Sequence, residues 1–588
     1  MYLYKLQIKN FRKIKESTIH FRPGLNILIG ENNSGKSSII DALRLCLNLG
    51  GNQRRDLFVT LDDFHIDSYN PTYSSEDIEF HLSFKKEKDE ELVYFGDLHA
   101  EIEINDVPES EFQLHYRYNI YQVKGVKKVK YSVWGGENEG QRLNSDTDLF
   151  NMVYLGALRD AVSSLRPSKG NILGELYSKL QTDENEQKRL AGILKDSIGN
   201  DPDWNELIVK GQNKIIEHLS SSSVSGDELN VEIDFIPFEF RRIVDTLVME
   251  FPIYTEEQLG ATRENQKYFS VYQNGLGYNN LVYIATILGN LKEIKESENS
   301  KFVSLLVEEP EAHLHPQLQN VFFDYLNKLN ELGLQVFLSS HSPTITARSN
   351  LDSLIVIQNK KSKNYAFALS QSILSKNNKE YLSKFLDVTK SQLFFSKGVI
   401  LVEGISEALL LPVFSKIMGD EFRIEKAGIE TVNLNGVAFE HFGKLFNSDE
   451  EEKRLNFRCV IITDDDRTEE SEEVSSRALK AKELEGGLLK VELATITFEY
   501  ELFMHGENRN ILLDTFRELH PIAASNIKEG ESLNDFAMNF IEKVKANKAK
   551  SRLAHSLAHK LEGSEELQKR FTVPAYIQNA IKYVLLKD

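Results

Sequence analysis

LNILIGENNSGKSSIIDALRL, residues 25–45, joins a short apolar run to a glycine-rich turn and then to a helix-like pattern. The run before Gly30 is typical of a buried strand, and the residues after Ser37 repeat their apolar side chains at helical spacing. Gly30 and Gly35 let the backbone turn sharply between the two elements. Strands and helices alternate again from about residue 277 onward, which indicates a parallel sheet flanked by helices.

The loop within this stretch, GENNSGKS, matches the phosphate-binding pattern G-x(4)-G-K-[ST] between a strand and a helix. Backbone N–H groups of such a loop point at phosphate oxygens, Lys36 reaches the terminal phosphates, and the Ser37 hydroxyl binds Mg²⁺. We therefore predict that ATP and its Mg²⁺ bind at Gly30, Asn32, Asn33, Ser34, Gly35, Lys36, Ser37 and Ser38.

A second apolar run ends in acidic residues at LLVEEPE, residues 305–311. Because the carboxyl ends of parallel strands share one edge of a sheet, Glu308 and Glu309 are expected to meet the phosphate loop. Glu308 would hold the magnesium water, and Glu309 would polarise the attacking water. His341, in LSSHSP after the next strand, is expected to sense the γ-phosphate; in isolation, a hydrogen-bonded structural histidine would be the safer interpretation.

The chain resembles the ABC-type ATPase heads of SMC, Rad50 and RecF proteins in several features together: the phosphate loop, a long insertion, and the segments NGLGYNN, LLVEEPEAHLHP and SSHSP. The resemblance implies that Asn274, Gly275 and Gly277 form a signature loop that reaches the nucleotide of a facing head. Asn274 and Gly275 stand in place of that family's usual serine. Because such heads act in pairs, the resemblance also implies a homodimer or tetramer, with a helical insertion at residues 161–235 as its dimerisation surface.

Another apolar run ends in an acidic residue at VILVEGISE, residues 399–407. Gly404 lets the chain turn from a strand into a helix, and Glu407 lies one helical turn beyond Glu403.

VIITDDDR, residues 460–467, ends a further apolar run in three aspartates. Alternation along a strand places Asp464 and Asp466 on one face and Asp465 on the other. Oxygen ligands of this kind suit hard divalent cations such as Mg²⁺ or Mn²⁺. The sequence thus predicts a metal site made of Glu403, Glu407, Asp464 and Asp466.

E-G-x-x-E followed by D-x-D on successive strands resembles the Toprim fold of topoisomerases, primases and certain nucleases. An ABC head followed by Toprim in one chain resembles the OLD (overcoming lysogenization defect) nuclease family, which includes the A subunit of the Gabija anti-phage system. The resemblance implies two-metal cleavage of double-stranded DNA. It adds Glu499 and Glu501, expected on one face of a strand in TFEYELF, and Lys550, with Lys548 and Arg552 as alternatives. It also suggests a helicase partner like that of Gabija, or a retron-like partner.

Composition limits the other possibilities. A formal net charge of −19 argues mildly against a passive nucleic-acid coat but not against local contacts with DNA. Residues 543–560 hold six lysine and arginine residues and no acid. No apolar run approaches the ~18 residues of a membrane span, and two cysteines fit a reducing cytosol, so we expect a cytoplasmic protein without membrane contact.

The expected fold is α/β, an ABC-type ATPase head of the SMC/Rad50/RecF kind with a helical insertion, followed by a C-terminal Toprim domain. The expected boundaries are residues 1–160, 161–235, 236–385 and 392–588, for the ATPase N-terminal lobe, the insertion, the ATPase C-terminal lobe, and Toprim with a helical extension. Alternating patterns at 76–160 predict antiparallel strands, and the charged segment 468–487 is expected to form a loop and helix without chemistry.

The expected function is an ATP-regulated, divalent-metal-dependent DNA endonuclease that acts in phage defence or DNA repair. A RecF-like DNA-binding protein without cleavage is the alternative, and the complete acid set argues against it because clamping DNA needs no metal carboxylates. A topoisomerase or primase lacks support, since no tyrosine stands in a recognisable strand-passage context.

Overall fold

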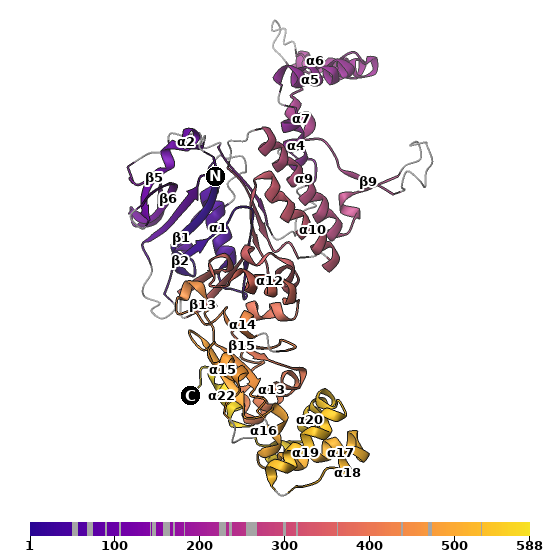
Figure 1. Cartoon of the computed structure of the whole chain (residues 1–588). Coiled ribbons are helices and arrows are strands. Elements are labelled where there is room, and N and C mark those ends of the chain that lie inside the picture. The colour runs from indigo at the N-terminus through magenta and orange to yellow at the C-terminus, as the bar shows by residue number, and fades with distance from the viewer. Residues whose placement is uncertain are drawn as a thin grey trace. The chain divides into compact units, whose positions relative to one another are not determined.

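The computed structural model describes most of the chain and forms two compact units, Met1–Thr147 with Gln335–Asp588, and Asp148–Leu334 (Figure 1). The described residues are 1–49, 57–67, 75–88, 91–104, 107–140, 143, 149–156, 165–168, 171–181, 183–222, 231–233, 238–253, 267–297, 302–312, 315–360, 363–436, 439–467, 473–530 and 532–587. Within them, no helix combines the length and apolar character that crossing a membrane requires.

The N-terminal part of the first unit contains an antiparallel sheet, ordered β2-β1-β4-β6-β5 with β7 beside β6. Its strands are β1 (Tyr2–Phe11), β2 (Ile14–His20), β4 (Asp77–Lys85), β5 (His99–Ile104), β6 (Val107–Val123) and β7 (Val126–Gly135). The antiparallel pairing predicted within residues 76–160 is confirmed for β4, β5, β6 and β7, and β1 pairs in the same sense with β2 and β4. The Tyr116 hydroxyl donates to the carbonyl of Cys46 at 2.9 Å, which ties this sheet to the helix after the phosphate loop.

A second sheet carries the phosphate loop. In the first unit it contains β3 (Leu25–Ile29), β12 (Gln335–Ser339), β13 (Leu354–Lys360) and β14 (Lys363–Ala368). β3 pairs in parallel with β12 and β13, and β14 is antiparallel to β13. Every residue of β3 and β12 is buried, as expected for parallel strands covered on both faces. Helix α1 (Lys36–Leu47) follows directly, so the predicted strand, loop and helix are confirmed.

The second unit pairs β8 (Phe150–Leu155) in parallel with β11 (Phe302–Glu308). The sequence had assigned residues 76–160 to antiparallel strands, and this is wrong for β8. Five of its six residues are buried, which suits a parallel strand covered on both faces better than an alternating antiparallel strand.

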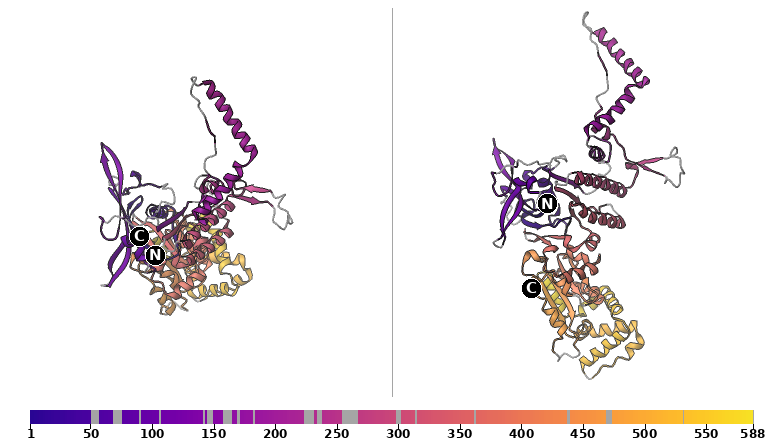
Figure 2. Two further views of the ribbon diagram at one scale, coloured as in Figure 1. Left: turned by 90° about the horizontal axis from the view of Figure 1, so that it is seen from above. Right: turned by 45° about the horizontal axis from the view of Figure 1, so that its top comes forward.

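Most of the described residues of the second unit lie in helices: α4 (Ile172–Leu180), α5 (Glu184–Gly199), α6 (Pro202–Ser222), α7 (Phe240–Val244), α9 (Leu276–Ser297) and α10 (Pro316–Lys328). A short antiparallel pair, β9 (Glu250–Pro252) and β10 (Tyr268–Ser270), completes it. The sequence predicted helices between residues 161 and 235, and the structure has α4, α5 and α6 there. In Figure 2, α6 extends away from the α4–α9 pair.

In the chain, α11 (Pro343–Arg348) lies between β12 and β13, and α12 (Lys376–Phe385) lies between β14 and the C-terminal region. The C-terminal domain, by which we mean residues 396–587, contains a parallel sheet ordered β16-β15-β17-β18. Its strands are β15 (Gly398–Val402), β16 (Ile429–Asn433), β17 (Cys459–Asp464) and β18 (Leu489–Ala494). Its helices are α13 (Ile405–Met418), α14 (Phe439–Gly443), α15 (Ser476–Lys482), α16 (Phe498–Met504), α17 (Asn508–Leu519), α18 (Pro521–Ser525), α19 (Leu533–Ala546), α20 (Lys550–Gly563), α21 (Glu565–Arg570) and α22 (Ala575–Val584).

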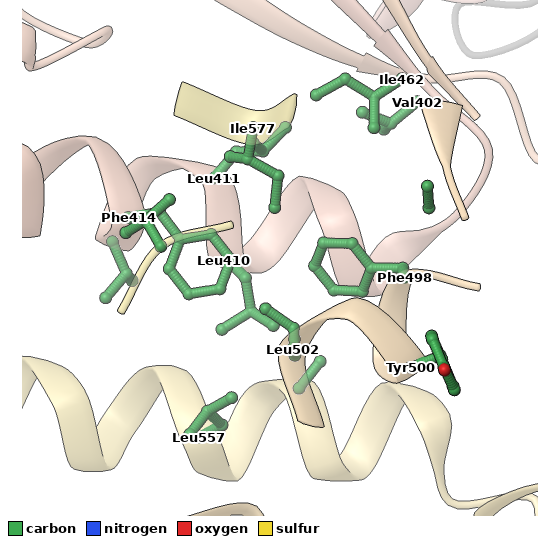
Figure 3. Close-up of a cluster of buried hydrophobic side chains, with 14 of the residues drawn as sticks. Val402, Leu410, Leu411, Phe414, Ile462, Phe498, Tyr500, Leu502, Leu557 and Ile577 are labelled. Carbon is green, nitrogen blue, oxygen red and sulfur yellow. The ribbon is translucent and has the colours of Figure 1, made fainter. Parts of the chain in front are cut away.

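One apolar core joins this sheet to the helices around it (Figure 3). Phe414 of α13 is fully buried and stacks on Phe571 with ring centroids 5.2 Å apart. Leu410 of α13 and Leu557 of α20 belong to the same core, in which Figure 3 shows the two helices side by side. This packing holds α13, and with it Glu407 in the first turn of that helix, against the sheet.

Replacing Phe414 with alanine is expected to destabilise the C-terminal domain by ~3–5 kcal/mol, because the change removes a fully buried aromatic ring and leaves a cavity. Ile522, which is 80% exposed, provides a control, and Ile522→Ala should change stability by less than ~0.5 kcal/mol. Amide hydrogen exchange of peptides from α13 measures both effects. Equal protection in the two variants would contradict the packing described here.

Candidate nucleotide and metal sites

The phosphate loop leaves β3 at Gly30 and enters α1 at Lys36. Gly30 has φ 137°, and a Cβ atom there would lie 2.3 Å from the carbonyl oxygen of Ile357. Gly35, with φ 110°, caps the helix in a left-handed conformation. Both glycines of the motif are therefore required by backbone geometry, and only glycine fits where the loop passes β13.

The lysine of the loop is held inside it. Lys36 is 4% exposed, and its Nζ donates to the carbonyls of Gly30 at 2.8 Å and Glu31 at 2.7 Å. The side-chain amide of Asn364 in β14 donates to the backbone carbonyl of Ser34 at 3.0 Å and so helps to hold the conformation of the phosphate loop. A buried ammonium group at the N-terminus of a helix is suited to bind a phosphate group.

The other predicted nucleotide residues lie at the ends of secondary-structure elements. Asn274 and Gly275 precede α9, and Gly277 lies in its first turn. Glu308 ends β11, where its Oε2 accepts from the Tyr154 hydroxyl at 2.6 Å, and Glu309 follows with φ 44°. These residues belong to the second compact unit, whereas His341, just after β12, belongs to the unit of the phosphate loop. Their shared role in nucleotide chemistry stays a prediction.

In the C-terminal domain, two parallel strands end side by side in acidic residues. β15 pairs with β17 so that Val402 lies opposite Ile462, and Glu403 follows β15 directly. Oε1 of Glu403 accepts from the backbone N–H of Asp464 at 3.2 Å and from the hydroxyl of Thr463. The two predicted motifs, separated by about sixty residues in sequence, are thus brought together by strand pairing.

The three aspartates have different surroundings. Oδ1 of Asp464 accepts from the N–H of Phe498 at 2.8 Å. Asp465 is fully buried, and its carboxylate accepts from Ser475 N at 2.7 Å and from Arg467, so it faces away from the other acids. Asp466 lies beyond the end of β17 with φ 59° and is exposed. Its orientation is therefore set by a left-handed turn and not by strand alternation.

Burial and mutual repulsion disfavour ionisation of the inner carboxylates. Burial raises the pKa of Glu407 to about 7, and the charges of Glu499 and Glu403 add to the shift. Burial also raises the pKa of Asp464 well above its usual range, with further contributions from Glu499, Glu403 and Glu407. Burial alone would lower the pKa of Lys550, but Glu499 and the neighbouring acids outweigh it and raise that pKa. Lys550, paired with Glu499, and Arg477, paired with Glu403 and Asp466, only partly offset this concentration of negative charge, which favours binding of an additional cation.

The strand predicted for TFEYELF is wrong, because these residues form helix α16 (Phe498–Met504). Thr497 caps the helix, with its hydroxyl accepting from Tyr500 N at 3.3 Å. Residues 498–503 are all buried, so the period-two pattern of acids and apolar residues does not mark an exposed and a buried face.

Helix geometry separates the two glutamates that the sequence had placed on one face. Glu499 accepts from Lys550 Nζ at 2.8 Å and contributes to the charge around Asp464. Oε1 of Glu501 accepts from Thr495 N at 2.8 Å, and Oε2 lies 3.8 Å from His505 Nδ1. Glu499 acts on the charge of Asp464, whereas Glu501 bonds the turn between β18 and α16 and acts on Tyr576 together with Asp464, Glu407 and Glu499. The predicted role of Glu501 stays a prediction.

Of the three basic residues predicted as candidates for the site, Lys550, Lys548 and Arg552, the contacts favour Lys550. It begins α20 and pairs with Glu499, whereas Lys548 occupies a left-handed turn position just before the helix, with φ 50°. Arg552 instead borders a shallow pocket with His555 and other residues on the outside of α20.

Arg477 is a residue of the site that the sequence did not reveal. It lies in α15, within the segment to which no chemistry had been assigned, and its guanidinium bridges Glu403 and Asp466. Tyr576 is a second such residue. It is 9% exposed, and burial, together with the charges of the neighbouring acids, raises its pKa. Neither residue belongs to a motif, so only a contact across the fold could identify them.

The side chains of this acid cluster are chemically suited to bind a divalent cation. Its members are carboxylates, the ligands that Mg²⁺ and Mn²⁺ prefer, and burial with mutual repulsion raises the pKa of Glu407 and of Asp464. Among the described residues, however, no group of three or more histidine, cysteine, aspartate or glutamate side chains is arranged to hold a metal ion. Arg477 and Lys550 pair with acids of the cluster, so binding a cation requires these ion pairs to open.

Comparisons with known proteins match an ATPase part and a TOPRIM part of the chain. A family model described as "AAA ATPase domain" matches residues 1–133 and 151–346, and one described as "Overcoming lysogenization defect protein-like, TOPRIM domain" matches residues 394–466. Endonuclease GajA of Bacillus cereus (strain HuB5-5) is 23% identical over 569 residues, covering 80% of this chain and 78% of that protein. The Old nuclease of Escherichia phage P2 is 24% identical over 520 residues, covering 84% of each chain.

One solved structure is similar to part of the chain. The C-terminal region of the Xanthomonas campestris pv. campestris OLD protein, phased with iodine, covers 33% of this chain and 95% of that one. The two are 23% identical, with a TM-score of 0.23.

Proposed function

Because the chain belongs to the OLD (overcoming lysogenization defect) family of nucleases, with an AAA ATPase domain before an OLD-like TOPRIM domain, we propose that it cuts double-stranded DNA with divalent metal ions under the control of ATP. The observation that carries the proposal is the meeting of Glu403 and Asp464 at paired strand ends, with Glu407, Glu499 and Lys550 around them. Anti-phage defence is the proposed setting, since it fits the similarity to GajA.

The residues that would hold the metal ions are Glu403, Glu407, Asp464, Asp466 and Glu499. Bound there, divalent cations supply a water of lowered pKa and stabilise the leaving oxygen of a phosphodiester. The protein contributes fixed ligand positions: Thr463 donates to Glu403, and the N–H of Phe498 donates to Asp464. Such outer contacts orient ligands before the metal arrives.

Lys550 supplies the positive charge of the proposed site. Its Nζ is 2.8 Å from Glu499, and its side chain is 42% exposed, so it can turn from the acid toward a DNA phosphate. There its charge would offset the negative charge that develops on the phosphoryl oxygens. Lys550 also lies within the basic run at residues 543–560, which is suited to hold the DNA backbone.

ATP control is assigned to the phosphate loop, with Lys36 on the terminal phosphates and Ser37 on Mg²⁺. Glu308, Glu309 and His341 are proposed to complete the nucleotide site. We propose a homodimer or tetramer, since heads of this type act in pairs. A helicase like the partner of Gabija systems, or a retron-like partner, is proposed as the second protein.

Incubation of the purified full-length chain with supercoiled plasmid tests the proposal. Nicked or linear DNA should form with Mg²⁺ or Mn²⁺ and should not form with EDTA. Intact plasmid under all metal conditions, together with ATP-dependent DNA binding, would instead support a RecF-like protein that binds without cutting.

Replacing Arg477 with alanine is expected to strengthen Mn²⁺ binding about fivefold, because the guanidinium competes with the cation for Glu403 and Asp466. Calorimetric titration with Mn²⁺ measures the effect without any DNA. Arg517→Ala is the matched control, since Arg517 is 64% exposed and pairs only with Asp514 among the contacts described. Weaker Mn²⁺ binding in the Arg477 variant would show that the arginine supports the site instead.

A further inference from the structure

β6 and β7 form a hairpin in the antiparallel sheet (Figure 1), and its tip extends beyond the neighbouring strand β4. β4 pairs with β6 only as far as Asn119, which lies opposite Asp77, the first residue of β4. The β6–β7 ladder continues past that point until Val123 lies opposite Val126. We call residues 119–130 the hairpin arm.

The two strands of the arm are joined by a two-residue turn, Lys124 and Gly125. Both residues have positive φ, 49° and 82°, as a turn that matches the twist of a hairpin requires. A Cβ atom on Gly125 would meet no heavy atom within 4 Å, and residues 121–128 are all exposed. The arm is therefore a regular two-stranded ribbon whose tip no other described part of the chain covers.

The arm is basic in a chain that is acidic overall. Four of its residues between positions 124 and 130 are lysines: Lys124, Lys127, Lys128 and Lys130. No acidic residue occurs from Phe112 to Gly136, although the whole chain has a formal net charge of −19. None of the four lysines forms an ion pair within the described part of the chain. Their charges are therefore available to an anionic partner.

Strand alternation gathers part of this charge on one face of the ribbon. Tyr121 lies opposite Lys128, and Asn119 lies opposite Lys130, so these four side chains share a face. Lysine, tyrosine and asparagine side chains all donate to phosphate oxygens of DNA. Positions two apart on a strand are separated by roughly 6.4–6.8 Å, so Lys128 and Lys130 can reach separate phosphates.

The base of the hairpin is anchored, and the acids beside it already have partners. The guanidinium of Arg117 lies over the ring of Trp134, 5.4 Å from its centroid, and its Nε donates to Glu79 of β4 at 2.9 Å. Asp77 of β4 accepts from Asn10 at 3.2 Å. These two β4 acids, which share the face of Arg117 and Asn119, thus do not neutralise the lysines of the arm.

The shape and charge of the arm suit double-stranded DNA. The major groove of B-DNA is about 12 Å wide and admits a two-stranded β-ribbon. Phosphates line both sides of that groove, so a ribbon with lysines at its tip and along one face can contact the backbone without reading the bases.

We propose that the hairpin arm binds the phosphate backbone of double-stranded DNA, as a contact separate from the carboxylate site of the C-terminal domain. The inference rests on the proposed function, in which double-stranded DNA is the substrate. It gives the ATPase part of the chain its own hold on the DNA.

Fluorescence anisotropy of a short labelled duplex, titrated in EDTA with the full-length chain at several salt concentrations, tests the proposal. Lys128→Gln combined with Lys130→Gln removes two charges and keeps two polar side chains on the ribbon. At about 0.1 M salt the double variant should bind the duplex about tenfold more weakly. The slope of log affinity against log salt concentration should become shallower by about 2, because two phosphate contacts are lost.

Lys188→Gln combined with Lys376→Gln is the matched control, because it removes the same charge from side chains that are 76% and 90% exposed. The control should keep the wild-type affinity and slope. An arm that contacts a protein partner, or that only prevents the sheet edge from pairing with other chains, would leave the slope unchanged in the Lys128 and Lys130 variant. That result would overturn the proposal, as would a wild-type chain that does not bind the duplex.

Failure of the nuclease assignment has a different signature. The wild-type chain would then bind the duplex with the salt dependence described above and leave supercoiled plasmid intact in Mg²⁺ and in Mn²⁺. Cleavage by the wild type, with an unchanged salt slope in the double variant, would instead reject the arm and keep the nuclease.

Discussion

Asp464→Asn is expected to reduce metal-dependent DNA cleavage on the order of 10³-fold, because it removes the charge of a central carboxylate where several kcal/mol of transition-state stabilisation depend on bound metal. The asparagine side chain keeps a carbonyl oxygen that can accept from the N–H of Phe498, so the strand end should remain folded. ATP binding should stay within about twofold of wild type, since no atom of the phosphate loop changes.

Rates of supercoiled plasmid nicking in Mg²⁺ or Mn²⁺ measure this effect. Asp514→Asn is the matched control, because Asp514 is 63% exposed and pairs with Arg517 on the surface of α17. Full nicking activity in the Asp464 variant would place the catalytic metals elsewhere.

Lys36→Ala is expected to weaken ATP binding about 100-fold, because charged hydrogen bonds to the terminal phosphates are among the strongest contacts a protein offers them. The same change leaves the carboxylates of the C-terminal domain intact. Metal binding there should therefore persist, while the response of cleavage to ATP should disappear.

Equilibrium binding of a fluorescent ATP analogue measures the loss of nucleotide affinity, and Mn²⁺ titration measures the metal binding that should persist in the C-terminal domain. Lys15→Ala, at a side chain that is 55% exposed on β2, is the control and should bind the analogue normally. ATP affinity that survives the removal of Lys36 would show that the loop does not hold the nucleotide.

Motifs whose residues are adjacent in sequence could be predicted well. The phosphate loop is one continuous segment between a strand and a helix, and the structure has β3 and α1 where that segment requires them. Glu403 and Asp464 each end a strand with buried residues, and strands of that kind pair in parallel at a common edge. Local pattern and topology together were sufficient for these positions.

Helix α16 was mispredicted because periodicity identifies an element only when one of its faces is exposed. Glu499 and Glu501 alternate with Phe498, Tyr500 and Leu502, as in a strand, yet all five are buried. β8 was misassigned because the alternating pattern of the strands before it was extended to a segment in which five of six residues are buried.

Arg477 could not be predicted, because its contacts join distant parts of the chain. Arg477 pairs with Glu403 across 74 residues, and nothing beside either residue signals the other. Such juxtapositions depend on how separate elements pack, which a single sequence does not encode in a local pattern.

The most direct test of the central claim, that the C-terminal carboxylates hold the metals that cut DNA, is the Mn²⁺ dependence of plasmid nicking in the wild type and in Glu407→Gln. Glu407 is buried in the first turn of α13, among the acids but outside the phosphate loop. The account predicts that the half-maximal Mn²⁺ concentration rises about tenfold in this variant, and that Glu440→Gln, at a side chain 58% exposed, leaves it unchanged. An identical Mn²⁺ dependence for wild type and Glu407→Gln would contradict it.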